Sequence, residues 1–184
     1  YLCRYFNLPE VANYWEQVII MNDHQKYRFA KNIISTLFNT VNGKKVAFLG
    51  WAFKKDTNDT RESAAIYVAE YLIEDGAEIH VFDPKVSEAK VRADLRYLWD
   101  LKGVSEEKII QKLTQVTVYT EPMKAVHNAH AVAVLTEWDE FKTYDWTTIY
   151  EHMFKPAFVF DGRNILDAAM MQKIGFHFKG IGKG

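Results

Sequence analysis

The chain has 184 residues, 48% of them hydrophobic and 26% charged, so it can bury one core of ordinary domain size and carry a short appendage. Its 23 Lys and Arg against 24 Asp and Glu give a formal net charge of -1. This balance excludes the broad basic field that holds nucleic acid or an anionic membrane without specificity. Any anion must therefore be held by a local site.

A single cysteine, Cys3, excludes an intramolecular disulfide and favours a reducing compartment. No signal peptide is visible, and the apolar run 131-AVAVL-135 is too short to cross a bilayer. We therefore expect a cytoplasmic protein that does not bind membranes. Because the chain opens at Tyr1 inside a helical pattern, we interpret it as a fragment of a longer protein.

Residues 1–40 predict a long helix that forms a segment of its own. Pro9 suits its first turn, and a bend near 21-MND-23 is compatible with the pattern. The apolar residues that recur at helical spacing are Val11, Trp15, Val18, Phe29, Ile33 and Leu37. This face is larger than one small domain covers, so it packs on the rest of this chain, or on an absent domain or second subunit.

From Lys44 onward, apolar strands alternate with amphipathic helices. The strands are expected at residues 45–50, 77–84, 116–120, 131–137 and 157–163, and residues 175–182 close the chain. The helices are expected at residues 61–75, 122–129, 146–153 and 164–173, with a further charged helical stretch that ends near residue 113. This order predicts an α/β domain over residues 41–184, with a doubly wound, Rossmann-like parallel sheet covered on both faces.

Ligands of such sheets bind outside the carboxyl ends of the strands. At the first of these ends stands 48-FLGWAFKKDTNDTRES-63, where a dinucleotide-binding domain would carry a glycine-rich loop. Gly50 is the only glycine and bulky Trp51 follows it, so the pattern argues against a pyrophosphate on this turn. Lys54 and Lys55 can reach a phosphate as point cations, or they can be solvated surface lysines.

Two arginines also lie near strand ends. Asp59 and the glutamate three residues on predict a helix N-cap, which would place Arg61 in the first helical turn. A cation gains nothing from the helix dipole there, so a nearby anion would explain it. In 160-FDGRN-164, Arg163 offers a planar fork to a phosphate, although an ion pair with Asp161 or Asp167 would also account for it.

Five runs of the sequence then resemble one family. They are 8-LPEVANYWEQVIIMND-23, 53-FKKDTNDTRES-63, 81-VFDPKV-86, 134-VLTEWDEF-141 and 158-FVFDGR-163, in order and with compatible spacing over essentially the whole chain. Together they are similar to the carboxyl-terminal part of the UDP-glucose 6-dehydrogenase family, of the animal type. The resemblance implies an NAD-binding Rossmann domain upstream, a central helix that builds a dimer core, and a carboxyl-terminal Rossmann-like domain that binds the UDP portion of UDP-glucose.

The resemblance also implies roles for individual residues. Phe53, Lys54 and Arg163 would contact the UDP-sugar, and Arg61 would contact NAD across the interdomain cleft. Cys3 has no base nearby in sequence, and the family's nucleophilic cysteine belongs to a motif upstream of Tyr1. We therefore assign no catalytic residue to this chain and expect it to be inactive alone.

Other polar and aromatic residues are interpreted structurally. Asp83 could contact a ribose by general analogy, but Pro84 follows it and we expect turn chemistry instead. Trp138 and the six histidines are interpreted as packing or surface residues, because no two histidines have metal-ligand spacing with a supporting cysteine or carboxylate.

Two alternatives remain open. The chain could belong to a dehydrogenase for another nucleotide sugar, such as UDP-N-acetylmannosamine or GDP-mannose, or it could be a non-catalytic nucleotide-binding or assembly module. The residues that precede Tyr1 would distinguish these, because a cysteine in a glycine-rich turn favours the enzyme. We expect a homo-oligomer, at least a dimer, formed through the long helix.

Overall fold

The computed structural model describes residues 1–182, so the last two residues of the predicted domain lie outside the described part. Nine helices and six strands follow one another in these residues: α1 Leu2–Tyr5, α2 Pro9–Thr36, β1 Lys45–Leu49, α3 Ala64–Glu74, β2 Glu78–Phe82, α4 Glu88–Leu101, α5 Glu106–Leu113, β3 Val116–Tyr119, α6 Pro122–Val126, β4 Ala131–Val134, α7 Asp139–Thr143, α8 Trp146–His152, β5 Phe158–Asp161, α9 Ala168–Ile174 and β6 His177–Gly180.

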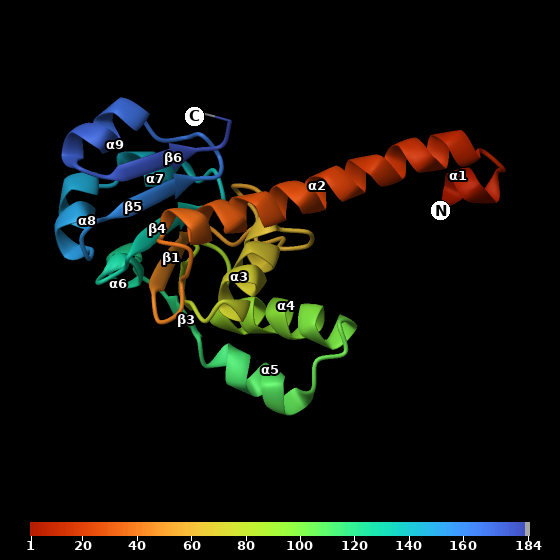
Figure 1. Cartoon of the computed structure of the whole chain (residues 1–184), viewed down its shortest axis with the longest axis horizontal. Coiled ribbons are helices and arrows are strands. Elements are labelled where there is room, and N and C mark those ends of the chain that lie inside the picture. Colours follow the sequence, from red (N-terminus) through yellow and green to blue (C-terminus); the bar gives the residue numbers. More distant parts are fainter. Residues whose placement is uncertain (183–184) are drawn as a thin grey trace.

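The six strands form one parallel sheet in the order β3-β2-β1-β4-β5-β6. Every residue of β4 and β5 is buried, as expected for strands covered on both faces. The strand order reverses between β1 and β4, which lie side by side in the sheet (Figure 1). Val46 of β1 pairs with Ile79 of β2 on one side and with Ala131 of β4 on the other. The predicted doubly wound fold is confirmed, and its switch point lies between β1 and β4.

Helix α2 has two different environments. It runs unbroken through residues 21–23, and its carboxyl-terminal part buries Phe29, Ala30 and Ile33 in the core. In its amino-terminal part only Ala12 is buried, and this part projects away from the domain with α1 at its tip (Figure 1). Packing on this chain therefore accounts for one half of the predicted apolar face and leaves the other half exposed.

Helix α3 begins later than its sequence indicates. The hydroxyl oxygen of Ser63 accepts a hydrogen bond from Ala65 N at 3.3 Å, so Ser63 is the N-cap. Glu62 has a φ of 59°, which is not helical, so the predicted start at residue 61 was wrong. The predicted end is confirmed, because Gly76 directly follows the C-cap with a φ of 84°.

Smaller differences concern the other helices. The charged stretch before residue 113 forms two helices, α4 and α5, and the short α7 was not predicted. Helix α9 starts at Ala168 because the Asp167 carboxylate accepts from Ala169 N and Met170 N. Among the helices of residues 1–182, none is both long and apolar enough to cross a membrane.

Candidate functional site

A cavity of about 760 Å³ lies beside the switch point of the sheet. Five parts of the chain line it: α2, the β1–α3 loop with the first half of α3, the residue after β4, the residues after β5, and the residue after β6. The lining residues that matter below are Asn22, Lys26, Phe29, Phe53, Glu62, Leu135, Gly162 and Arg163. Both its place and its size are those of a small-molecule site in a doubly wound sheet.

Side chains of the protein fill the turn after β1 and leave no room there for a ligand. Gly50 has a φ of 97°, and a Cβ on it would lie 2.4 Å from the Cβ of Thr136 after β4, so only glycine fits. Trp51 follows, fully buried, and its indole N–H donates to Asp94 Oδ2 at 3.1 Å. A bulky buried side chain thus stands where a dinucleotide fingerprint would leave bare backbone.

Asp83, at the end of β2, holds this turn. The residue is 7% exposed. It accepts five hydrogen bonds, from the N–H of Trp51 at 2.7 Å, Ala52 at 2.9 Å, Lys85 at 2.9 Å and Val86 at 3.1 Å, and from the indole of Trp138 at 3.2 Å. The expected turn role of Asp83 and the packing role of Trp138 are confirmed. Because Asp83 occupies the amides of Trp51 and Ala52, the turn has no free donors there for a pyrophosphate.

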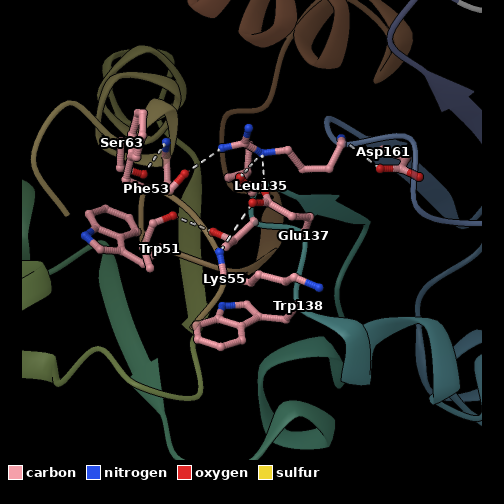
Figure 2. Close-up of polar contacts among 12 residues, drawn as sticks. Trp51, Phe53, Lys55, Ser63, Leu135, Glu137, Trp138 and Asp161 are labelled. Atoms are coloured by element: carbon pink, nitrogen blue, oxygen red, sulfur yellow. Dashed lines mark hydrogen bonds and ion pairs between the residues drawn. The ribbon is translucent and has the colours of Figure 1, made fainter. Parts of the chain in front are cut away.

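Arg163 spans the site. Its Nε donates to Leu135 O at 2.8 Å, its Nη2 donates to Phe53 O at 3.0 Å, and its Nε lies 3.4 Å from Glu137 Oε2 (Figure 2). The alternative explanation, an ion pair with Asp161 or Asp167, does not form within residues 1–182. Asp161 instead accepts from two backbone amides of its own loop, and Asp167 caps α9.

Arg163 and Phe53 line the same cavity. The guanidinium joins the β1 loop to the ends of β4 and β5, and its Nη1 makes no hydrogen bond to residues 1–182. Phe53 is 48% exposed and lines the cavity together with Arg163. The structure therefore brings two of the predicted ligand-contacting residues together, with guanidinium donors left for an anion.

The two adjacent lysines of the loop differ. Lys55 Nζ lies 2.5 Å from Asp139 Oδ2, and this hydrogen bond raises the pKa of Lys55. Lys54 is exposed, does not line the cavity, and has no hydrogen bond or ion pair with residues 1–182. Lys54 is thus the available cation of the pair, and Lys55 is already neutralised.

Arg61 lies before α3 rather than in its first turn. Its Nε and Nη2 donate to the carboxylate of Asp59 at 2.9 Å and 2.7 Å, and these bonds lower the pKa of Asp59 to about 2. The predicted N-cap role of Asp59 was wrong, and Asp59 is itself the nearby anion that the sequence led us to expect. The Arg61 side chain is 85% exposed and does not line the cavity.

Sequence reasoning missed Lys26, a second cation that lines the cavity. Only 13% of its side chain is exposed. Its Nζ lies 3.1 Å from Asp23 Oδ1, 3.6 Å from Glu62 Oε2 and 3.7 Å from the ring centroid of Tyr67. The Tyr67 hydroxyl donates to Glu62, and burial together with this bond raises the pKa of Tyr67 to about 12. Asn22, Lys26 and Phe29 recur at helical spacing, a signal that an analysis of apolar residues alone passes over.

The remaining titratable residues do not build a metal site. No cluster of three or more His, Cys, Asp or Glu residues that could hold an ion occurs within residues 1–182. Burial lowers the pKa of His80 to about 4, and its ring packs against Tyr119 with centroids 5.1 Å apart. Cys3 is partly exposed on α1.

Residues 47–168, more than half of the chain, match the model of the UDP-glucose/GDP-mannose dehydrogenase family, UDP binding domain. The chain is 52% identical over 185 residues to the UDP-glucose 6-dehydrogenase of Pongo abelii, covering 100% of this chain and 36% of that protein. It is 50% identical over 190 residues to UDP-glucose 6-dehydrogenase 1 of Arabidopsis thaliana, covering 100% of this chain and 39% of that protein. The chain thus spans little more than a third of the length of these relatives.

Solved structures share the fold. An NDP-N-acetyl-D-galactosaminuronic acid dehydrogenase from Methanosarcina mazei Go1 is similar over 88% of this chain and 29% of that chain, with a TM-score of 0.65 and 24% identity. A UDP-D-ManNAc dehydrogenase from Pyrococcus horikoshii is similar over 88% of this chain and 31% of that chain, with a TM-score of 0.62 and 24% identity.

Proposed function

The chain belongs to the UDP-glucose/GDP-mannose dehydrogenase family and carries its UDP-binding domain, and on this basis we propose that it is the UDP-sugar-binding half of a UDP-glucose 6-dehydrogenase. The parent enzyme would oxidise UDP-glucose to UDP-glucuronate with two NAD. NAD would be bound mainly by an amino-terminal domain that this chain does not include. The chain alone would bind the UDP-sugar without oxidising it.

The position of Arg163 is the observation that carries this proposal. Its guanidinium is fixed by two backbone carbonyls at the switch point of the sheet, and it keeps Nη1 donors beside a cavity that a nucleotide fits. The exposed ring of Phe53 adds an apolar surface for the same ligand. In this proposal Arg163 and Phe53 contact the UDP-sugar. Lys26 lies in the opposite wall, on α2, where Asp23 and Glu62 already compensate its charge.

Lys54 and Arg61 do not line the cavity. Each would therefore contact a ligand, or a part of a ligand, that extends beyond the cavity. We assign Lys54 to the UDP-sugar, because it directly follows Phe53 and is unpaired within residues 1–182. We assign Arg61 to NAD bound by the upstream domain. Its exposure of 85% suits a contact across a cleft, although Asp59 competes for the same guanidinium.

The exposed end of α2 supports an oligomer. Tyr14, Trp15, Ile19 and Ile20 on α2 are each more than half exposed, and α1 adds Tyr5. A continuous apolar surface of this kind is rare on a monomer. We propose that residues 1–40 form a dimerisation segment that pairs with the same helix of a second subunit, while residues 41–184 form the UDP-sugar-binding domain. Sedimentation of the chain as a soluble monomer at micromolar concentration would contradict this part.

Calorimetric titration of the chain with UDP-glucose tests the binding role. Arg163→Ala should weaken binding about tenfold or more, because it removes a charge-assisted contact of ~1.5–3 kcal/mol. Lys108→Ala is a matched control, since Lys108 is exposed on α5 without an ion pair in residues 1–182. Equal affinity of the Arg163→Ala variant and the parent chain for UDP-glucose would show that Arg163 does not contribute to binding.

Two further measurements separate the alternatives. Titration with GDP-mannose and UDP-N-acetylmannosamine would reveal another sugar specificity if either bound more tightly than UDP-glucose. Absorbance at the NADH wavelength, with UDP-glucose and NAD present, should stay constant for this chain, whereas the full-length parent should form NADH. A parent that binds UDP-glucose but never forms NADH would indicate the non-catalytic module.

A further inference from the structure

A second cavity, of about 790 Å³, lies between α2 and the edge strand β6. Arg28, Lys31 and Asn32 line it from α2, and Lys179 and Gly180 line it from β6. It adjoins the first cavity, because Gln25, Phe29 and Ile181 line both. This second cavity, which we call the β6 groove, has no role in the binding of the UDP-sugar proposed above.

The β6 groove is basic in a chain whose net charge is slightly negative. Arg28, Lys31 and Lys179 all line it, and no aspartate or glutamate does. None of these three cations has an ion pair within residues 1–182, and the Nζ of Lys31 lies 5.9 Å from the ring centroid of Tyr27. In contrast, Lys55 and Arg61 beside the first cavity are both paired with carboxylates. Three like charges without a counter-ion favour an anionic ligand.

The groove also offers uncharged donors. Gln25 and Asn32 carry side-chain amides, and they share one face of α2 with Arg28 because the spacings are three and four residues. Gly180 and Gly182 lack side chains, so a ligand can approach the backbone closely. Within residues 1–182, strand β6 pairs with β5 alone, which leaves its outer backbone donors outside the ladder. Cations, amides and accessible backbone together are the donor set that phosphate prefers.

We propose that the β6 groove is a second anion site, which takes a small ligand carrying two or more phosphates and is separate from the UDP-sugar cavity. The charge count favours a multiply charged ligand over a single carboxylate. The volume admits a molecule of nucleotide size. The two cavities share part of their walls through Gln25, Phe29 and Ile181, so the second arm of the test below must fill the UDP-sugar cavity to keep the two sites apart.

The test uses inorganic pyrophosphate as the probe, titrated into the chain at fixed ionic strength. One arm contains no nucleotide, and a second arm contains saturating UDP to fill the first cavity. The site predicts saturable binding in both arms. Arg28→Ala and Lys179→Ala should each weaken it about fivefold, the value for a solvent-exposed ion pair near 1 kcal/mol, while Lys179→Arg retains it.

Two variants make the result specific. Lys108→Ala removes an equally exposed lysine on α5 and should leave pyrophosphate binding unchanged, whereas Arg163→Ala should weaken UDP but not pyrophosphate. Loss of pyrophosphate binding under saturating UDP, together with sensitivity to Arg163→Ala, would place the anion in the first cavity and overturn the proposal. Equal affinity of the parent chain and the Arg28→Ala, Lys179→Ala double variant would overturn it as well. If UDP fails to bind, the nucleotide proposal fails, while the first arm still decides the groove.

Replacing pyrophosphate by ATP or by a dinucleotide would then show whether a nucleoside strengthens binding. Tighter binding of ATP than of pyrophosphate identifies a nucleotide as the ligand class. Equal binding identifies the phosphates alone as the recognised group. Both results support the site, and they differ only in the source of its phosphates.

Discussion

The loop between β1 and α3 consists of two parts that differ in almost every physical respect. Its inner part, Gly50–Ala52, is buried and bonded to Asp83 and Thr136. Its outer part, residues 53–62, is mostly exposed. Arg61 pairs with Asp59 inside this part, Lys55 pairs with Asp139 outside it, and Lys54 is solvated. The inner part thus fixes the shape of the loop, and the outer part leaves Phe53 and Lys54 exposed and accessible to a ligand.

This difference explains how a Rossmann-like domain can bind a nucleotide without a glycine-rich turn. In a dinucleotide fold the backbone after the first strand faces the pyrophosphate, so small residues are needed. Here the same backbone donates to Asp83, and a buried Trp51 fills the space. In the proposed function, recognition of the ligand comes instead from side chains farther along the loop and from Arg163, whose guanidinium donates to the carbonyl of Phe53.

The largest expected effect is on the inner part. Asp83→Ala removes the acceptor of five hydrogen bonds and leaves several buried N–H groups without a partner. Each unsatisfied buried donor costs about 1–3 kcal/mol, so we expect the free energy of unfolding to fall by about 3 kcal/mol or more. Urea denaturation measures this free energy of unfolding. The control is Asp100→Ala on the exposed surface of α4, whose free energy of unfolding should lie within about 0.5 kcal/mol of that of the parent chain. A similar small loss for both variants would mean that the turn does not depend on Asp83.

A smaller effect is expected from Thr136, which closes the same turn from β4. Its hydroxyl donates to Ala52 O at 2.6 Å and is fully buried. Thr136→Val keeps the shape and removes the donor, so the Ala52 carbonyl is left unsatisfied at a cost of about 1–2 kcal/mol. Thr117→Val, at the exposed position of β3, is the matched control and should be close to neutral. If the two variants have equal midpoints in urea, the hydrogen bond to Ala52 contributes nothing measurable.

The sequence predicted the inner part better than the outer part, and the reason is physical. Apolar continuity identifies buried strands, a single glycine followed by tryptophan argues against a phosphate turn, and Pro84 after Asp83 indicates turn chemistry. All of these are local properties. The hydrogen-bond acceptors of Arg163 could not be predicted from local sequence, because Leu135 and Phe53 are 28 and 110 residues away from it in the chain.

The start of α3 illustrates a different limit. Both Asp59 and Ser63 are good N-cap residues, and sequence alone does not say which one the backbone selects. The structure selects Ser63, because Glu62 takes a left-handed conformation and Asp59 is bonded to Arg61. Likewise, Lys26 joins the cavity only because α2 crosses the sheet end beside α3, a tertiary fact with no local signature except its helical spacing.

The smallest expected effect distinguishes the two exposed cations of the outer part. In the full-length parent, Lys54→Ala should raise the dissociation constant for UDP-glucose and leave that for NAD unchanged, and Arg61→Ala should do the reverse. We expect about fivefold in each case, because both side chains are exposed and surface ion pairs contribute at most about 1 kcal/mol.

Protonation and binding measurements together decide this last prediction. The pKa of Asp59, lowered to about 2 by Arg61, means that the pair stays ionised above about pH 4 and is lost only as the pH falls from there toward 2. The effect of Arg61→Ala on NAD should therefore be constant from pH 5 to pH 8, by calorimetry at fixed ionic strength. Equal weakening of both ligands by Lys54→Ala would contradict the division between the two cations. If neither ligand weakens in either variant, the outer part of the loop is only a solvated surface, and Arg163 and Phe53 alone recognise the nucleotide.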